Sequence, residues 1–273
     1  LFVYGGAAVI ILSFVVVTFF IGTERAAVSY PRRLLGMVPP GLTQAAGLFG
    51  VAGYLFPVAA GLFGSQSFTD NISPTLFWLF FLLGFAYLTL LIGDIWQFIN
   101  PFKTLLGWAE RVLKTEIKPR FVYPEKLGYF PALAVYVGFI WLELLSAGWG
   151  VVPLNLTNTL LGYGVLTIIG VLAFGKDNWF RYGDFFSLFF RLFGYISPIQ
   201  YAGSKVYLRP PFVGLLDEAK LSISLLLFVL FALSSTAFDG LKEAAPYARV
   251  LNLVGNETAV LLLMPLAFLV LYG

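Results

Sequence analysis

The sequence contains neither cysteine nor histidine. Without cysteine there can be no disulfide and no thiolate nucleophile. Without histidine there is no imidazole base and none of the usual histidine ligands of zinc, copper or haem. Any catalysis or metal binding by these residues would have to use carboxylates, hydroxyls, amides, Lys or Arg. The residues themselves therefore predict no catalytic residue, no metal site and no cofactor.

Charged residues are also scarce. They make up 11% of the chain and hydrophobic residues 59%, whereas a soluble domain has about 25% charged residues. This composition excludes an ordinary soluble domain. The net charge is +3 and the pI is near 9.0. Because the basic residues gather between apolar stretches, we expect them to contact anionic lipid headgroups and not nucleic acid.

Seven long apolar stretches make up most of the chain. Each is long enough to cross a hydrocarbon layer of about 30 Å as a helix that rises about 1.5 Å per residue. They predict an all-α, polytopic transmembrane helical bundle that forms a single domain over residues 1–273. Because the chain begins with Leu1 and not Met, we expect this domain to be incomplete. The stretches are residues 1–22, 42–64, 75–99, 130–153, 154–175, 221–238 and 250–272.

The basic residues alternate between the six gaps that separate these stretches. The first, third and fifth gaps contain fifteen of the 17 Lys and Arg residues, the second and fourth contain none, and the sixth contains Lys242 and Arg249. Basic residues in short loops stay on the cytoplasmic side. We therefore expect a multi-pass protein of the cell membrane with its N-terminus outside and its C-terminus inside.

Two cytoplasmic gaps contain helices of their own. Asn100 is a good N-cap, and residues 100–116 have an apolar face and a charged face that includes Lys103, so they predict an interfacial amphipathic helix. Asp184 can cap a Phe-rich helix over residues 184–195. That helix is too short to span, so it either lies in the membrane interface or dips back as a re-entrant segment.

The second apolar stretch contains small residues spaced by three or four positions. Such residues fall along one face of a helix and let a neighbouring backbone approach closely. We interpret this face as a packing surface. Its residues are Ala46, Gly50, Gly53, Pro57, Gly61 and Gly64.

Three carboxylates fall inside the predicted spans, where an unpaired charge is costly. Glu143 is near the middle of the fourth stretch, Asp94 is in the inner part of the third, and Glu257 is in the outer third of the seventh. The functional interpretation is a proton or cation relay. The alternative is a set of buried hydrogen bonds that fix helix packing.

A group of polar residues gathers where the sixth stretch ends and the seventh begins. Asn252 and Asn256 would be one turn apart on the same helix face. The oxygen atoms of this group suit a small cation or a polar solute, and the group is equally typical of a water-facing helix hairpin. Its members are Ser234, Ser235, Thr236, Asp239, Asn252 and Asn256.

Several short motifs lie along the chain: Gly93-Asp94-Ile95-Trp96, Asn100-Pro101-Phe102-Lys103-Thr104-Leu105, Trp141-Leu142-Glu143-Leu144, Phe174-Gly175 with Trp179, Gly183-Asp184-Phe185, and Ser235-Thr236-Ala237-Phe238-Asp239-Gly240-Leu241. Together they resemble a family of prokaryotic polytopic membrane proteins, many of which carry the name fenitrothion hydrolase. The resemblance implies organophosphate hydrolysis. It also implies a chain that extends past both ends, with His residues in the outlying parts.

We interpret the chain as a non-catalytic subunit or scaffold of a larger membrane complex, because it lacks redox ligands and has faces suited to packing. One alternative is a transporter or channel with a carboxylate relay at Glu143. A second is a membrane-embedded hydrolase of organophosphate-like substrates. The expected partners are the lipid bilayer, with anionic headgroups at the cytoplasmic face, and other membrane subunits.

Overall fold

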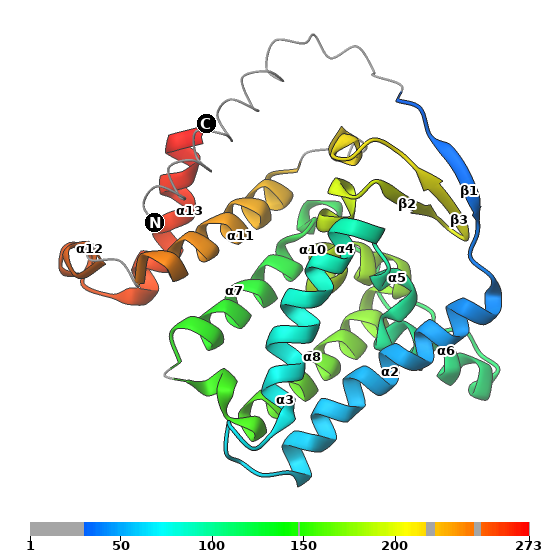
Figure 1. The fold of residues 1–273 in the computed structure, drawn as a ribbon, viewed down its shortest axis with the longest axis horizontal. Coiled ribbons are helices and arrows are strands. Elements are labelled where there is room, and N and C mark those ends of the chain that lie inside the picture. The colour runs from blue at the N-terminus through cyan, green and yellow to red at the C-terminus, as the bar shows by residue number, and fades with distance from the viewer. Residues whose placement is uncertain (1–29, 147, 217–221, 243–246, 273) are drawn as a thin grey trace. The chain divides into compact units, whose positions relative to one another are not determined.

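The computed structural model describes residues 30–146, 148–216, 222–242 and 247–272. These residues are mostly helical, which confirms the predicted all-α bundle, and Figure 1 shows its elements. The long helical segments are α2 (Pro40–Phe63), the continuous run of α3 (Ile72–Thr75), η1 (Leu76–Gly84) and α4 (Phe85–Ile92), then η2 (Glu125–Leu127) leading into α7 (Phe130–Leu144), α8 (Pro153–Phe174) and α11 (Ile223–Lys242).

Shorter helices connect and cover these segments. Two segments, η1 within the long run that ends in α4 and η4 among the shorter helices, have π-helical geometry. Such wide turns occur frequently at functional sites. The shorter helices are α5 (Trp96–Ile99), α6 (Pro101–Leu113), η3 (Trp149–Val151), α9 (Lys176–Asn178), η4 (Trp179–Gly183), α10 (Phe185–Ile196), η5 (Val213–Leu216), α12 (Tyr247–Val254) and α13 (Glu257–Tyr272).

Five helical segments in the described part of the chain are long and apolar enough to cross a membrane, and they match the second to sixth predicted stretches. The chain is therefore a membrane protein. The seventh stretch is divided, because α12 and α13 meet at a 100° bend. Gly255 lies at this bend with φ +79°, a conformation that glycine adopts readily. The first stretch lies outside the described residues, so the count of seven spans and the orientation stay predictions.

Two predicted spans end earlier than the sequence indicated. The third ends at Ile92, because Gly93 adopts φ +88° and turns the chain. The fourth ends at Leu144, and a turn with Gly148 at φ +83° leads into η3. Glu143 was predicted near the middle of a span, but the structure places it next to the last residue of α7.

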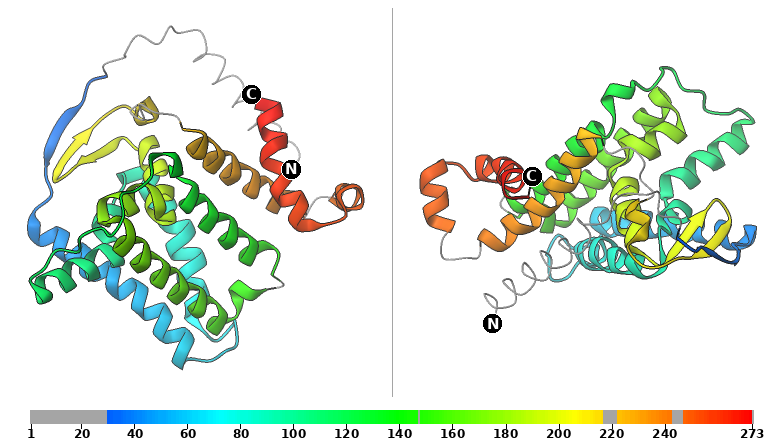
Figure 2. Two further views of the ribbon diagram at one scale, coloured as in Figure 1. Left: turned by 180° about the vertical axis from the view of Figure 1, so that it is seen from behind. Right: turned by 90° about the horizontal axis from the view of Figure 1, so that it is seen from above.

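The helix α10 packs inside the bundle, against α4, α5 and α7. Its surroundings can be followed in Figure 1 and, from two other sides, in Figure 2. Phe185, Phe186 and Phe190 of α10 are all at most 4% exposed. A helix lying in the membrane interface would keep one face toward lipid, so this burial fits the re-entrant alternative better.

A small antiparallel sheet, which the sequence analysis did not predict, lies beside α4 and α10. It contains β1 (Arg33–Met37), β2 (Ile199–Ala202) and β3 (Lys205–Leu208) in the order β1-β3-β2. A tight turn with Gly203 at φ +61° joins β2 to β3. The sheet therefore ties the segment before α2 to the segment that follows α10.

The small-residue face of α2 packs against its neighbours at some positions and not at others. Gly50 is buried against α5, where an added Cβ would overlap the carbonyl oxygen of Ile99. Gly61 is buried against Thr157 of α8. At Gly53 an added Cβ would meet nothing within 4 Å, so this residue does not pack as the sequence pattern predicted.

This difference between two glycines of one helix gives a matched test. We expect Gly50→Ala to destabilise the protein by about 1–3 kcal/mol, because overpacking forces the backbones of α2 and α5 apart. Gly53→Ala is the control and should leave stability unchanged or slightly higher, since alanine favours helix. Thermal unfolding in detergent micelles measures both. Equal melting temperatures for the two variants would contradict this account of the α2 surface.

Candidate functional site

Three ionisable residues lie beside α10: Asp184 is its N-cap, Asp94 packs against Gly194 near its other end, and Lys103 belongs to the neighbouring α6. The ammonium group of Lys103 interacts electrostatically with both carboxylates. We call these three residues the charge cluster. All three lie outside the five candidate spans, in the segments that connect them.

Asp184 is the N-cap of α10 and is only 2% exposed. Its Oδ2 atom accepts a hydrogen bond of 3.0 Å from the backbone N–H of Ser187, and its Oδ1 atom accepts one from the Tyr163 hydroxyl on α8. Burial raises the pKa of Asp184, and the hydrogen bonds from Ser187 and Tyr163 partly oppose this effect. Asp184 therefore takes up a proton more readily than an exposed aspartate does.

Asp94 follows the turn at Gly93 and packs directly against α10. A Cβ at Gly194 of α10 would lie 2.9 Å from the Cβ of Asp94, so only glycine allows this approach. The Oδ1 atom of Asp94 is buried and has no hydrogen-bond partner in the described part of the chain. Burial raises the pKa of Asp94, while the charges of Arg191 and Lys103 lower it. A buried carboxylate oxygen without a donor is well suited to bind a proton.

Asn100 joins the start of α6 to α10. Its Oδ1 atom accepts hydrogen bonds from the backbone N–H groups of Phe102 at 3.0 Å and Lys103 at 3.2 Å, as an N-cap does. Its Nδ2 atom donates to the Ser187 hydroxyl at 3.2 Å. Since Ser187 also binds Asp184, Asn100 and Asp184 are linked through one residue.

The Lys103 side chain extends from α6 into this region. Its Nζ atom lies 5.1 Å from the centre of the Phe180 ring, a cation–π distance. Burial lowers the pKa of Lys103, and the two aspartates raise it. Lys103 therefore releases its proton more readily than a solvated lysine does.

The structure thus links Asn100 to Asp184 through Ser187, whereas Asp94 lies near the other end of α10. The sequence had predicted one intramembrane carboxylate and two separate caps. It also adds residues that sequence reasoning missed. Lys103 was assigned to the charged face of an amphipathic helix, whereas the structure turns it toward the two aspartates. Tyr163 is one of many aromatic residues in apolar stretches, and nothing in its spacing distinguishes it.

A second polar region lies in a cleft of about 600 Å³ between α4, α7, α10 and α11. Glu143 of α7 and Asp239 of α11 both line it, together with Tyr136, Ser235 and Thr236. Glu143 therefore lies with part of the polar group that was predicted where the sixth stretch ends and the seventh begins. The rest of the lining is mainly apolar.

Several members of that group form hydrogen bonds within their own helix. The hydroxyls of Ser234, Ser235 and Thr236 donate to carbonyls of their own helix at 3.0–3.1 Å. Asn256 caps α13 by accepting from the backbone N–H of Thr258 at 2.7 Å. The three hydroxyl hydrogens therefore bind α11 itself, and the Asn256 Oδ1 atom serves as a helix cap.

Asn252 and Asn256 are also separated by the bend between α12 and α13. They were predicted one turn apart on a single helix, but α12 ends at Val254 and α13 begins at Glu257. The two side chains therefore do not share a helix face. Glu257 forms an ion pair with Lys242 at 3.7 Å, which links the start of α13 to the end of α11.

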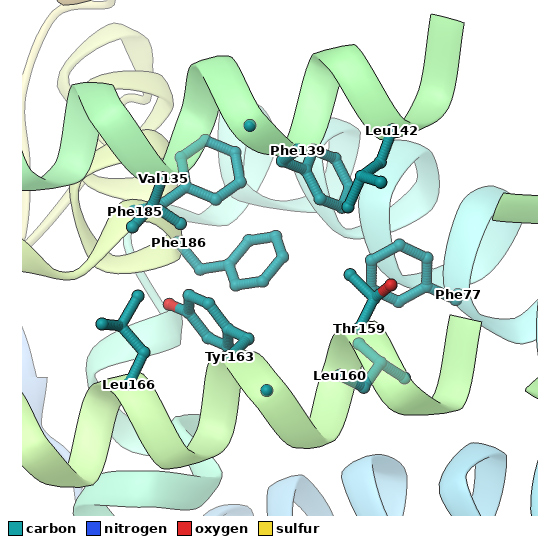
Figure 3. A pocket seen from close by; sticks show the side chains of 12 residues that line it. Phe77, Val135, Phe139, Leu142, Thr159, Leu160, Tyr163, Leu166, Phe185 and Phe186 are labelled. Atoms are coloured by element: carbon teal, nitrogen blue, oxygen red, sulfur yellow. The ribbon is translucent and has the colours of Figure 1, made fainter. Parts of the chain in front are cut away.

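Figure 3 shows a smaller cavity, of about 190 Å³, between α7 and α8. Phe185 and Phe186 of α10 lie between these two helices, and Tyr163 forms part of the wall. The Tyr163 hydroxyl binds Asp184, and the Thr159 hydroxyl binds the carbonyl of Asn155 at 2.9 Å. Because these polar groups are already paired and the remaining wall is apolar, we expect the cavity to be dry.

Comparisons with protein families, with curated proteins and with solved structures found no match to this chain. The family resemblance therefore stays a prediction. Among the residues that the structure describes, no group of three or more carboxylates is placed to hold a metal ion. The charge cluster and the cleft are therefore the two features of the described residues that bear on function.

Proposed function

We propose that the protein is a proton-coupled membrane transporter in which the charge cluster binds the coupling proton. The observation that carries this proposal is the Asp94 carboxylate, whose Oδ1 atom is buried without a hydrogen-bond donor in the described residues just after α4 ends. Lys103 interacts electrostatically with this carboxylate and with Asp184. Ionisable groups whose pKa values are shifted by burial and by neighbouring charges gather at functional sites.

The backbone around the cluster supports this proposal. Many transporters bind ions where helices are discontinuous within the membrane, because half-helix ends and unwound turns offer polar groups there. Here α4 stops at Ile92, α5 contains four residues, and α10 begins at Phe185, directly after its N-cap Asp184. The π-helical segment η4 leads directly into Asp184. Such geometry can shift without breaking a long helix.

Protonation would change the forces between these segments. With Asp94 ionised, its charge attracts Lys103 and Arg191, which belong to α6 and α10. Uptake of a proton by Asp94 removes this attraction, and α10 is then held less tightly to the α5–α6 segment. A proton can in this way shift the balance between two arrangements of the bundle.

The test is pH-driven transport by purified protein in lipid vesicles. We expect an imposed pH gradient to drive proton movement that depends on the protein, and Asp94→Asn to abolish that dependence. An asparagine keeps the shape of the side chain but cannot take up a proton. A pH-sensitive dye trapped inside the vesicles measures the movement.

Asp70→Asn is the matched control, because Asp70 is exposed in the loop between α2 and α3. It should transport as the unmodified protein does. If Asp94→Asn also transports normally, the charge cluster does not bind the coupling proton. The subunit and hydrolase interpretations draw no support from a particular contact in the described residues, and both stay predictions.

A further inference from the structure

We propose that the cleft between α4, α7, α10 and α11 binds a lipophilic cation, a compact apolar molecule with one positive charge. This inference names a substrate class for the transporter and rests on the proposed function for that role. Binding itself can be measured without transport.

The size and lining of the cleft fit such a molecule. Its volume is about 600 Å³, within the range of about 300–1,000 Å³ that is usual for small-molecule sites. Apolar side chains from four helices form most of its wall, among them Leu82, Phe189, Phe193 and Leu233. An apolar body is stabilised there because its surface is removed from water.

The charged residues that line the cleft favour a positively charged ligand. In the described part of the chain, its charged lining residues are Glu143 and Asp239, and no Lys or Arg lines it. The two carboxylates interact electrostatically with each other. Two negative groups in an apolar cleft favour a bound cation, because a cation offsets both their repulsion and their lost hydration.

The nearest lysine in the sequence does not neutralise these carboxylates. Lys242 lies one turn beyond Asp239 on α11, but its Nζ atom donates to the carbonyl of Leu144 at 2.8 Å and pairs with Glu257 at 3.7 Å. It is absent from the described lining of the cleft. The ring of Tyr136 also lines the cleft, but it packs against the rings of Phe185 and Phe228.

The cleft and the charge cluster share two helices. Phe189 and Phe193 of α10 line the cleft, and Asp184 at the start of the same helix belongs to the cluster. Ala86 and Leu90 of α4 line the cleft, and Asp94 follows the end of α4. A shift of α4 or α10 on protonation would therefore change the shape of the cleft, which is the link that coupled transport requires.

The experiment is equilibrium binding of radiolabelled tetraphenylphosphonium to the full chain in lipid nanodiscs. We expect saturable binding that tetraphenylborate, an anion of nearly the same size and shape, does not displace. The double variant Glu143→Gln/Asp239→Asn should bind at least about tenfold more weakly, which corresponds to about 1.4 kcal/mol. Glu257→Gln is the control, since Glu257 is a carboxylate nearby that does not line the cleft, and it should bind normally.

A second variant tests the volume of the cleft without changing its charge. Ala232→Phe keeps both carboxylates and fills part of the cleft, so it should also weaken binding. Equal binding by the double variant and the unmodified protein would overturn the inference, as would displacement by tetraphenylborate or the absence of saturable binding. Binding without proton-coupled transport would instead contradict the proposed function and leave the cleft as a cation site.

Discussion

The Lys103→Met variant is expected to be less stable by about 1–3 kcal/mol at neutral pH, because Asp94 and Asp184 lose a nearby positive charge that partly offsets their desolvation. Lys103 lowers the pKa of both Asp94 and Asp184, opposing the larger effect of burial. Without this cation, the lost hydration of each carboxylate is offset less. Methionine fills a similar volume, so the loss of stability reflects the missing positive charge more than a change in packing.

The pH dependence of this variant distinguishes charge from packing. Removing Lys103 raises the pKa of both aspartates in the folded state further above the unfolded value of about 3.9. A carboxyl with a raised folded-state pKa binds more protons when folded, so the stability it contributes is present at low pH and is lost as pH rises through that pKa. Lowering the pH from 7 toward 5 should therefore raise the melting temperature of Lys103→Met more than that of the unmodified protein.

Two further variants control this experiment. Lys103→Met/Asp184→Asn removes one carboxylate together with the cation, and we expect it to recover part of the lost stability. Lys118→Met changes an exposed lysine and should have little effect, because exposed charges contribute little. Melting of Lys103→Met at the same temperature as the unmodified protein, at both pH values, would mean that Lys103 does not compensate the aspartates.

Much of the helical framework could be predicted from the sequence. The bounds of α2, α8 and α11 lie within a few residues of the predicted stretches, because long apolar runs form helices in a membrane whatever their neighbours are. The hydrogen bonds of Asn100 and Asp184 at the starts of α6 and α10 are also local. Local hydrogen bonds and apolar length can both be read from adjacent residues.

The sites could not be predicted in the same way, because packing between distant segments creates them. Lys103 follows a correct amphipathic pattern, but the pattern cannot tell that buried carboxylates face its charged side. Glu143 appeared central only because the apolar run continues past the turn at Gly148. The bend at Gly255 likewise separates two asparagines that the helical period had placed together.

Replacement of Arg209 should destabilise the protein about as strongly as that of Lys103. Arg209 is 4% exposed, and its guanidinium donates to the carbonyls of Gly194 at 2.9 Å, Tyr195 at 3.1 Å and Ser197 at 3.2 Å. These carbonyls end α10, where a helix leaves its last acceptors unpaired and carries partial negative charge. Arg209→Met leaves them without these charge-assisted bonds, each of which contributes about 1.5–3 kcal/mol.

Thermal unfolding of Arg209→Met, Arg209→Lys and Arg111→Met tests this expectation. Lysine keeps the charge but cannot reach three carbonyls with a planar fork, so Arg209→Lys should fall between the unmodified protein and Arg209→Met. Arg111 is exposed on α6 and serves as the control. If Arg209→Lys were as stable as the unmodified protein, the charge alone would hold the end of α10. If Arg209→Met were as stable as the unmodified protein, the bonds of Arg209 would not hold the C-terminal end of α10. The buried phenylalanines of α10 would then be what keeps the helix beside Asp94.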